Sequence, residues 1–237
     1  MAKKMHDVGI LFNQFNLTGD HNSCDLLLDR DELDATPFGK TGTVRMTGLK
    51  SMQINHAGFF DETVDKIIFD LIDGSSDAIM TIVTGGMTVG NAAYSGRMKE
   101  TKYTPATGSV GNMYGFAGSA YSNDEYVRGI LIYGATAAAN GNGTAFNIGA
   151  VAAGQSLFGI CHITANTAAE PIIKIQSDNL EAFSTPTDII TITGGDNTLS
   201  SHWEKDSDAN TDAWYRVNIS GLTEGESITA YVVIGIH

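Results

Sequence analysis

Gly39, Lys40 and Thr41 are the residues most suggestive of chemistry, because the same tripeptide ends the phosphate-binding loop of many nucleotide-binding proteins. That loop has the pattern G-x-x-x-x-G-K-[ST] and connects a buried strand to a helix, so that backbone N–H groups surround the phosphates. Here Asp34 occupies the place of the first glycine, and its carboxylate would repel a phosphate. The residues that follow lack helical periodicity. The stretch therefore predicts a hairpin-like loop between two strands and no nucleotide binding.

A second candidate is an acidic loop in which oxygen-bearing side chains alternate, as they do in the first half of a calcium-binding loop. These residues are Asp206, Asp208, Asn210 and Asp212. The sixth position of the pattern is Thr211 where calcium loops need glycine, and the twelfth is Val217 where they need a bidentate glutamate. Clusters of Asp, Asn and Ser are also what ordinary turns are made of, so we expect a hydrophilic loop without a metal.

The remaining nucleophiles and ligands show no spacing typical of a catalytic or metal site. The six histidines are scattered without H-x-x-x-H spacing, and no G-x-S-x-G or C-x-x-C motif occurs. His56 and His162 lie in strand-like patterns and are expected to be ordinary sheet residues. Cys24 and Cys161 lie in separate apolar patterns, which favours free buried thiols over a disulfide. The sequence thus predicts no enzyme, no cofactor and no metal site.

Composition limits the possible partners. The formal net charge is −13, with 10 Lys and Arg against 14 Asp and Glu in residues 1–119, and 4 against 13 in residues 120–237. Such a chain is poorly suited to holding nucleic acid, since that affinity comes from Lys and Arg displacing counterions. No apolar run approaches the ~18 residues of a membrane span, and the first residues lack the apolar core of a signal peptide. We expect the chain to be made in a cytoplasm and to have no membrane partner.

One segment, residues 61–73, predicts a helix. Its apolar residues recur at helical spacing and form a single stripe made of Val64, Ile67, Ile68, Leu71 and Ile72. Asp61 can cap the first turn, and Gly74 can close the last. We expect a helix of about three turns that packs on a core.

Almost all other periodic segments predict strands. They alternate or are apolar, are bounded by turn residues, and cover residues 51–60, 78–84, 126–134, 156–165, 171–177, 187–193, 213–219 and 227–236. In 51–60 the alternation is carried by Met52, Ile54 and His56. Residues 227–236 are apolar on both faces, which indicates a central strand. The predicted class is all-β with one flanking α-helix, an antiparallel β-sandwich or barrel.

Residues 31–72 together resemble a signature of the tail tube (major tail) proteins of long-tailed bacteriophages. In that family a segment of the kind D-x-T-x-F-G precedes a strand with G-L-K and then G-F-F-D, and a short helix follows. The matching residues are Asp34, Thr36, Phe38, Gly39, Gly48, Leu49, Lys50, Gly58, Phe59, Phe60 and Asp61. The match covers about forty residues well, and the later strands are similar only in general character.

The resemblance implies two packed antiparallel sheets with one helix, and an arm that reaches a neighbouring subunit. The arm would span about residues 30–50, which carry charges of both signs, and its candidate residues are Asp31, Asp34, Thr36, Phe38, Gly39, Lys40 and Arg45. Copies would form rings stacked into a tube, together with other tail proteins. DNA would pass through the tube without specific binding, and the protein would reside in the virion after assembly in the bacterial cytoplasm.

Domain organisation and rival functions stay open at this point. The expected arrangement is a tail-tube-like β-domain at 1–105, a Gly/Ser/Thr-rich connection at 106–123 and a second β-rich block at 124–237, with hexameric or trimeric rings. A capsid-decorating or receptor-binding β-sandwich would share the composition. A carbohydrate-binding protein could use Trp203, Trp214 and Tyr215 as a stacking platform.

Overall fold

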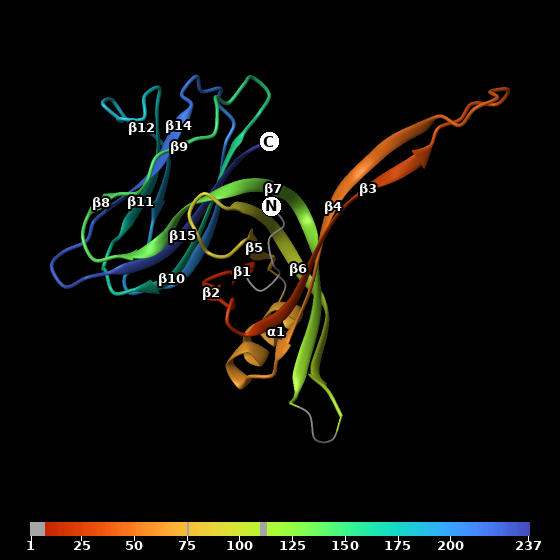
Figure 1. The fold of residues 1–237 in the computed structure, drawn as a ribbon, viewed down its shortest axis with the longest axis horizontal. Coiled ribbons are helices and arrows are strands. Elements are labelled where there is room, and N and C mark those ends of the chain that lie inside the picture. Colours follow the sequence, from red (N-terminus) through yellow and green to blue (C-terminus); the bar gives the residue numbers. More distant parts are fainter. Residues whose placement is uncertain (1–7, 75, 110–112) are drawn as a thin grey trace. The chain divides into compact units, whose positions relative to one another are not determined.

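The computed structural model describes residues 8–74, 76–109 and 113–237, which form antiparallel strands and one helix (Figure 1). The all-β prediction with one helix is confirmed for these residues. The described ranges do not include residues 1–7, on which the expectation of no signal peptide rests. They also do not include residues 110–112 of the expected connection. The elements in chain order are β1 (Val8–Phe12), β2 (Phe15–Asn16), β3 (His21–Asp34), β4 (Arg45–Phe59), α1 (Glu62–Asp73), β5 (Ala78–Thr84), β6 (Ala92–Thr107), β7 (Gly115–Ala137), β8 (Gly141–Asn142), β9 (Phe146–Asn147), β10 (Leu157–Asn166), β11 (Ile172–Asp178), β12 (Thr187–Thr193), β13 (Ser200–Asp206), β14 (Trp214–Ser220) and β15 (Ile228–Ile236).

The chain divides into two compact units that do not follow chain order. The first unit comprises Met1–Gly19, Ala78–Gly96 and Val127–His237, and the second comprises Asp20–Asp77 and Arg97–Tyr126. The expected boundaries at 105 and 124 differ from this division because β6 and β7 are long enough to contribute to both units. Most of the expected connection at 106–123 is strand, since β6 ends at Thr107 and β7 begins at Gly115.

The first unit is a β-sandwich. One sheet has the open strand order β13-β10-β15-β7-β6-β5-β1-β2, and the other has the order β12-β11-β14-β8, with β9 also paired to β14. Side chains of both sheets meet in one apolar core, which includes Cys161, Val232, Ile234, Ile175, Val217 and Tyr215. Alternate residues of β10 and β15, such as Ile160 and Val233, enter a second cluster on the opposite face. The prediction that residues 227–236 form a central strand is therefore confirmed.

In the second unit, β4 pairs with β3 along nearly its whole length and with β7 through residues 53–59. The helix α1 follows β4 directly. Asp61 caps it, because its carboxylate accepts hydrogen bonds from the backbone N–H groups of Thr63 and Val64 at 2.8 and 3.4 Å. Val64 and Ile68 are its buried residues. The helix at 61–73 is confirmed, and none of the described helices is long and apolar enough to cross a membrane.

The end of α1 differs from the expectation. Gly74 has an extended backbone, with φ −75° and ψ 147°, and it does not adopt the left-handed closing conformation. Glycine is favoured there for a steric reason, because a Cβ would lie 2.8 Å from the carbonyl oxygen of Asp70.

Candidate functional site: a hairpin arm

The candidate site is the part of the β3–β4 hairpin that extends beyond the pairing of β4 with β7, residues 28–52, which we call the arm. In Figure 1, β3 and β4 run side by side to a common tip. The seven residues predicted for an inter-subunit arm all lie here, Asp31 and Asp34 in β3, Thr36, Phe38, Gly39 and Lys40 in the connection, and Arg45 at the start of β4. The predicted hairpin-like loop at Gly39-Lys40-Thr41 is confirmed, since this tripeptide lies between two paired strands.

The D-x-T part of the motif closes the tip. The Asp34 carboxylate accepts hydrogen bonds from the Thr36 backbone N–H at 2.9 Å and from its hydroxyl at 2.5 Å. The Thr36 hydroxyl oxygen in turn accepts the backbone N–H of Val44 at 2.8 Å. These bonds from Thr36 hold the pKa of Asp34 below its ordinary value. The side chains of Asp34 and Thr36 thus hold together the two ends of the segment that connects β3 to β4.

The F-G part of the motif presents an aromatic ring to solvent. Gly39 has φ +86°, a left-handed conformation that glycine adopts without steric cost, and the turn is closed by a 3.3 Å bond from Lys40 N–H to the Pro37 carbonyl. Phe38, at the turn, is fully exposed, with a relative accessibility of 109%. This exposure makes Phe38 a candidate contact residue of the arm.

The sides of the arm also expose apolar residues. Leu33 and Met46 are directly opposite each other in the strand register, and both are more than half exposed. Leu49 is 82% exposed. A two-stranded ribbon is at best marginally stable in water, so exposed apolar side chains along it favour contact with a partner.

Charges of both signs accompany these apolar residues. Arg45 forms an ion pair with Glu32 across the strands, with both side chains largely exposed, and Arg30 Nε donates a 3.2 Å hydrogen bond to the Gly48 carbonyl. Exposed pairs of this kind add little to stability. Their value lies in setting the charge pattern that a partner would meet.

The second half of the motif, G-F-F-D, builds the base of the arm. Gly58 is required by packing, because a Cβ there would lie 2.1 Å from the Asp20 carbonyl oxygen and 2.7 Å from the Phe116 ring. The backbone N–H of Phe60 donates to the Tyr114 carbonyl at 2.9 Å, and Asp61 caps α1. The motif therefore specifies a strand end and a helix start that anchor the arm.

The base also holds a buried polar cluster that sequence reasoning did not identify. His56 is in a strand, as expected, and Met52, Ile54 and His56 are all buried. The imidazole of His56, however, lies 3.2 Å from the buried Glu100 carboxylate and 3.0 Å from the imidazole of His21. His56 is 35 positions from His21 and 44 positions from Glu100, so no local sequence pattern indicates the cluster. Only the strand register brings the three residues together.

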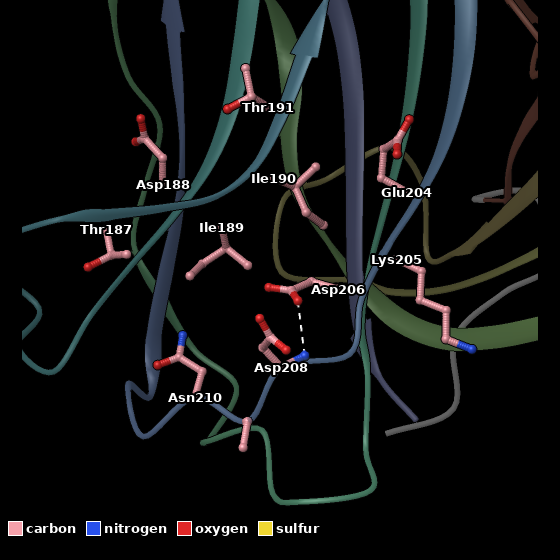
Figure 2. Close-up of a pocket in the computed structure, with 11 residues that line it drawn as sticks. Thr187, Asp188, Ile189, Ile190, Thr191, Glu204, Lys205, Asp206, Asp208 and Asn210 are labelled. Atoms are coloured by element: carbon pink, nitrogen blue, oxygen red, sulfur yellow. Dashed lines mark hydrogen bonds between the residues drawn. The ribbon is translucent and has the colours of Figure 1, made fainter.

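The acidic loop at 206–212 lies in the first unit beside a groove of about 620 Å³ that Asp188 and Glu204 also line (Figure 2). The Asp206 carboxylate accepts the backbone N–H of Asp208 at 3.0 Å, and Asp212 accepts the Ser177 hydroxyl at 2.7 Å. The first bond is a local turn interaction, and the second connects the loop to β11. Within the described ranges no three His, Cys, Asp or Glu side chains are grouped to hold a metal.

The proposed stacking platform is not formed. Tyr215 is fully buried in the sandwich core, and Trp203 packs edge-on against Phe158, with ring centroids 5.9 Å apart. Trp214 and Tyr215 are adjacent in a strand and so point to opposite faces of the sheet. The surface that the rival carbohydrate-binding interpretation would need, made of Trp203, Trp214 and Tyr215, is therefore not formed.

The two cysteines are free, as expected. Burial raises the pKa of both thiols to about 12. Cys161 lies in the sandwich core and Cys24 is partly buried in β3, so neither has the accessible thiolate that reactive cysteines need.

Comparison by sequence finds no matching protein family and no matching curated protein. Comparison by structure finds similar folds at low sequence identity. One is in the virion of a native gene transfer agent particle, with 16% identity, 53% of this chain and 97% of that chain covered, and a TM-score of 0.42. Another is the SPP1 tail tube, which is 12% identical. That match covers 54% of this chain and 78% of the tail tube chain, with a TM-score of 0.44. A third is the SPP1 Dit protein of a phage hub adsorption apparatus, which is 10% identical. That match covers 97% of this chain and 99% of the Dit chain, with a TM-score of 0.37. Tail tube and hub proteins are thus among the solved structures to which this chain is similar.

Proposed function

We propose that this protein is a structural virion protein, a tail tube subunit of a long-tailed bacteriophage whose copies form rings stacked around a DNA conduit. The observation that supports this proposal most directly is the arm. Its tip is shaped by Asp34, Thr36 and Gly39, the residues of the sequence signature, and it presents an exposed Phe38. A hydrogen-bonded tip with an exposed ring is useful to an assembling subunit and costly to a monomer.

In this proposal the arm docks on a neighbouring copy. Docking would cover Phe38 together with the apolar residues Leu33, Met46 and Leu49, which are exposed in the single chain. The charges on Asp31, Lys40 and Arg45 would set orientation and specificity. Unpaired strand edges in the ribbon offer further backbone hydrogen bonds, and a closed ring would satisfy them.

The partners follow from the charge. The chain has a net charge of −13, so we expect an inner wall that is acidic or neutral. An acidic wall would repel phosphates and a neutral one would not attract them, so DNA would slide through the tube without specific binding. Other tail proteins would contact the ends of the tube. We expect no catalysis and no cofactor, and we place the protein in the virion after assembly in the cytoplasm of the bacterial host.

The proposal is tested by negative-stain microscopy of the concentrated protein. Wild type is expected to form hollow tubes, whereas Phe38→Asp and a deletion of residues 36–43 are expected to stay as folded subunits, because they remove the docking surface of the arm. Leu180→Asp is a matched control, since Leu180 is an exposed apolar residue of the first unit.

Circular dichroism and thermal melting of each variant establish that the subunit is folded. Two results would overturn the proposal: an arm-deleted variant that builds normal tubes, or particles in which the protein occurs as isolated trimers on a capsid lattice. The second result would favour a capsid-decorating role.

A further inference from the structure

Three titratable side chains form a line inside the second unit, where the arm begins. Nε2 of His21, at the start of β3, lies 3.0 Å from Nδ1 of His56 in β4. Nε2 of His56 lies 3.2 and 3.3 Å from the two carboxylate oxygens of Glu100 in β6. The side chains of His56 and Glu100 have no solvent exposure. The cluster therefore links three strands through buried polar atoms.

The backbone leaves space for this cluster. A Cβ on Gly118 of β7 would lie 2.5 Å from both His56 Nε2 and Glu100 Oε1, so only glycine is compatible with these positions. The Phe116 ring packs edge-on against His21, with centroids 5.1 Å apart. Titratable groups near it include Cys24, which is opposite His56 in the register, and Asp20, which directly precedes His21. Tyr103 also lies near Glu100 and donates a 2.7 Å hydrogen bond to Asp65 of α1.

The geometry limits how many protons the cluster holds. An ionised Glu100 only accepts hydrogen bonds, so His56 Nε2 must donate to it. The bond between His21 and His56 needs one proton between the two ring nitrogens. It forms when both imidazoles are neutral, and it also forms when one of them is charged. When both are charged, two N–H groups point at each other at hydrogen-bond distance, and the contact becomes repulsive.

We propose that His21, His56 and Glu100 form a proton-controlled latch. While the two imidazoles share at most one positive charge, the latch holds the start of β3 against β4 and β6. When both imidazoles are charged, the latch releases the start of β3. Acid adds protons to imidazoles, so the latch opens on acidification. The arm continues from the same strand, and its anchoring becomes sensitive to pH. The latch is a property of the second unit and does not depend on tube formation.

Backbone amide hydrogen exchange of the full chain tests the latch. Protection of residues 22–28, corrected for the intrinsic effect of pH on exchange, is measured from pH 8 to pH 5. We expect wild type to lose this protection by about tenfold or more, because local opening of β3 becomes more frequent. Amides of β12 in the first unit serve as the internal reference for the acid destabilisation expected from His162, and the loss at residues 22–28 is expected to exceed theirs.

His21→Gln separates the latch from a general acid effect. Glutamine can still hydrogen-bond to His56 but takes no charge, so the variant is expected to keep its protection at pH 5. His202→Gln, a substitution in β13 of the first unit, is the matched histidine control and is expected to behave like wild type.

Imidazole ¹⁵N NMR on wild type gives a second readout that does not depend on a variant folding. It is expected to show Nε2 of neutral His56 protonated, and the two imidazoles titrating as a coupled pair. The proposal is overturned if both imidazoles become fully charged while residues 22–28 keep their protection. Equal loss of protection in wild type and His21→Gln would overturn it as well.

Discussion

At the scale of single residues, one buried histidine leads us to expect that stability depends on pH. His162 of β10 is fully buried in the first unit, where its Nδ1 donates to the Asn13 carbonyl and its Nε2 lies 2.8 Å from the Thr81 hydroxyl. Burial lowers the pKa of His162 to about 4, against an ordinary value of 6.5. The imidazole is therefore held neutral by its surroundings.

This shift predicts loss of stability in acid. Below pH 6.5 the unfolded chain takes up a proton on His162 that the folded chain refuses until about pH 4, so acidification favours unfolding. At pH 5 the lowered pKa of His162 reduces the free energy of unfolding by about 2 kcal/mol. Denaturant unfolding at pH 7 and pH 5 should show that His162→Gln loses about 2 kcal/mol less than wild type over this range. Equal losses in the two proteins would show that His162 does not carry the effect.

Thr36 offers a second residue-scale prediction. Thr36→Val keeps the shape of the side chain but removes the hydroxyl that accepts the Val44 N–H and donates to Asp34. The Val44 amide is expected to exchange faster with solvent in this variant, while Thr36→Ser, which retains the hydroxyl, is expected to resemble wild type. Unchanged protection of Val44 in Thr36→Val would contradict the role of Thr36 at the tip.

At the scale of elements, the helix α1 is held by a narrow buried stripe. Ile68 is fully buried, whereas its sequence neighbour Phe69 is 55% exposed. Ile68→Asp places a carboxylate in an apolar site and removes a packed side chain, and it should lower the free energy of unfolding by about 3–5 kcal/mol. Phe69→Asp should change it by less than about 1 kcal/mol, because surface substitutions usually have small effects. Thermal and chemical unfolding of both variants measures the difference, and a normally melting Ile68→Asp protein would show that α1 does not pack as described.

At the scale of the whole molecule, the proposed assembly brings an acidic chain against copies of itself. Lys40 and Arg45 near the tip of the arm would then be attracted to a neighbour whose net charge is −13. Screening shortens the range of this attraction from about 10 Å at 0.1 M salt to about 3 Å at 1 M.

The test compares growth of tubes by wild type and by a Lys40→Gln, Arg45→Gln double variant. Wild type should assemble faster at low salt, and the ratio of the two rates should approach one as salt rises. The ratio isolates the tip cations from the general repulsion between acidic subunits, which is nearly the same in both proteins. A ratio independent of salt would show that these cations do not act in assembly.

The elements that sequence alone predicts well are those whose periodicity is carried by large apolar residues. Residues 78–84 and 187–193 coincide with β5 and β12, and the helix begins after the predicted cap Asp61. In β14, which coincides closely with the predicted strand at 213–219, the alternate residues Tyr215, Val217 and Ile219 are buried. Burial of alternate residues, or of every third and fourth, leaves a direct trace in the order of residue types.

Sequence alone does not predict strands whose pattern is carried by small, polar or exposed residues. The first part of β7 buries Phe116, Gly118 and Ala120, and its Ser and Gly neighbours resemble a loop. Strand β3 has no fully buried residue between Asn22 and Asp34, so no alternation marks it. Its pairing with β4 defines it, and that partner lies beyond the reach of a local pattern.

What the sequence determined by itself is local: the β class, the single helix of the described chain, and an arm tip in which Asp34, Thr36 and Gly39 act over a few residues. Only the tertiary structure decided which distant strands share a unit, which aromatic residues are buried, and that His21, His56 and Glu100 meet. The physical reason is that strand pairing joins residues far apart in the chain. Register, which is set by packing of the whole sheet, then decides which of them touch.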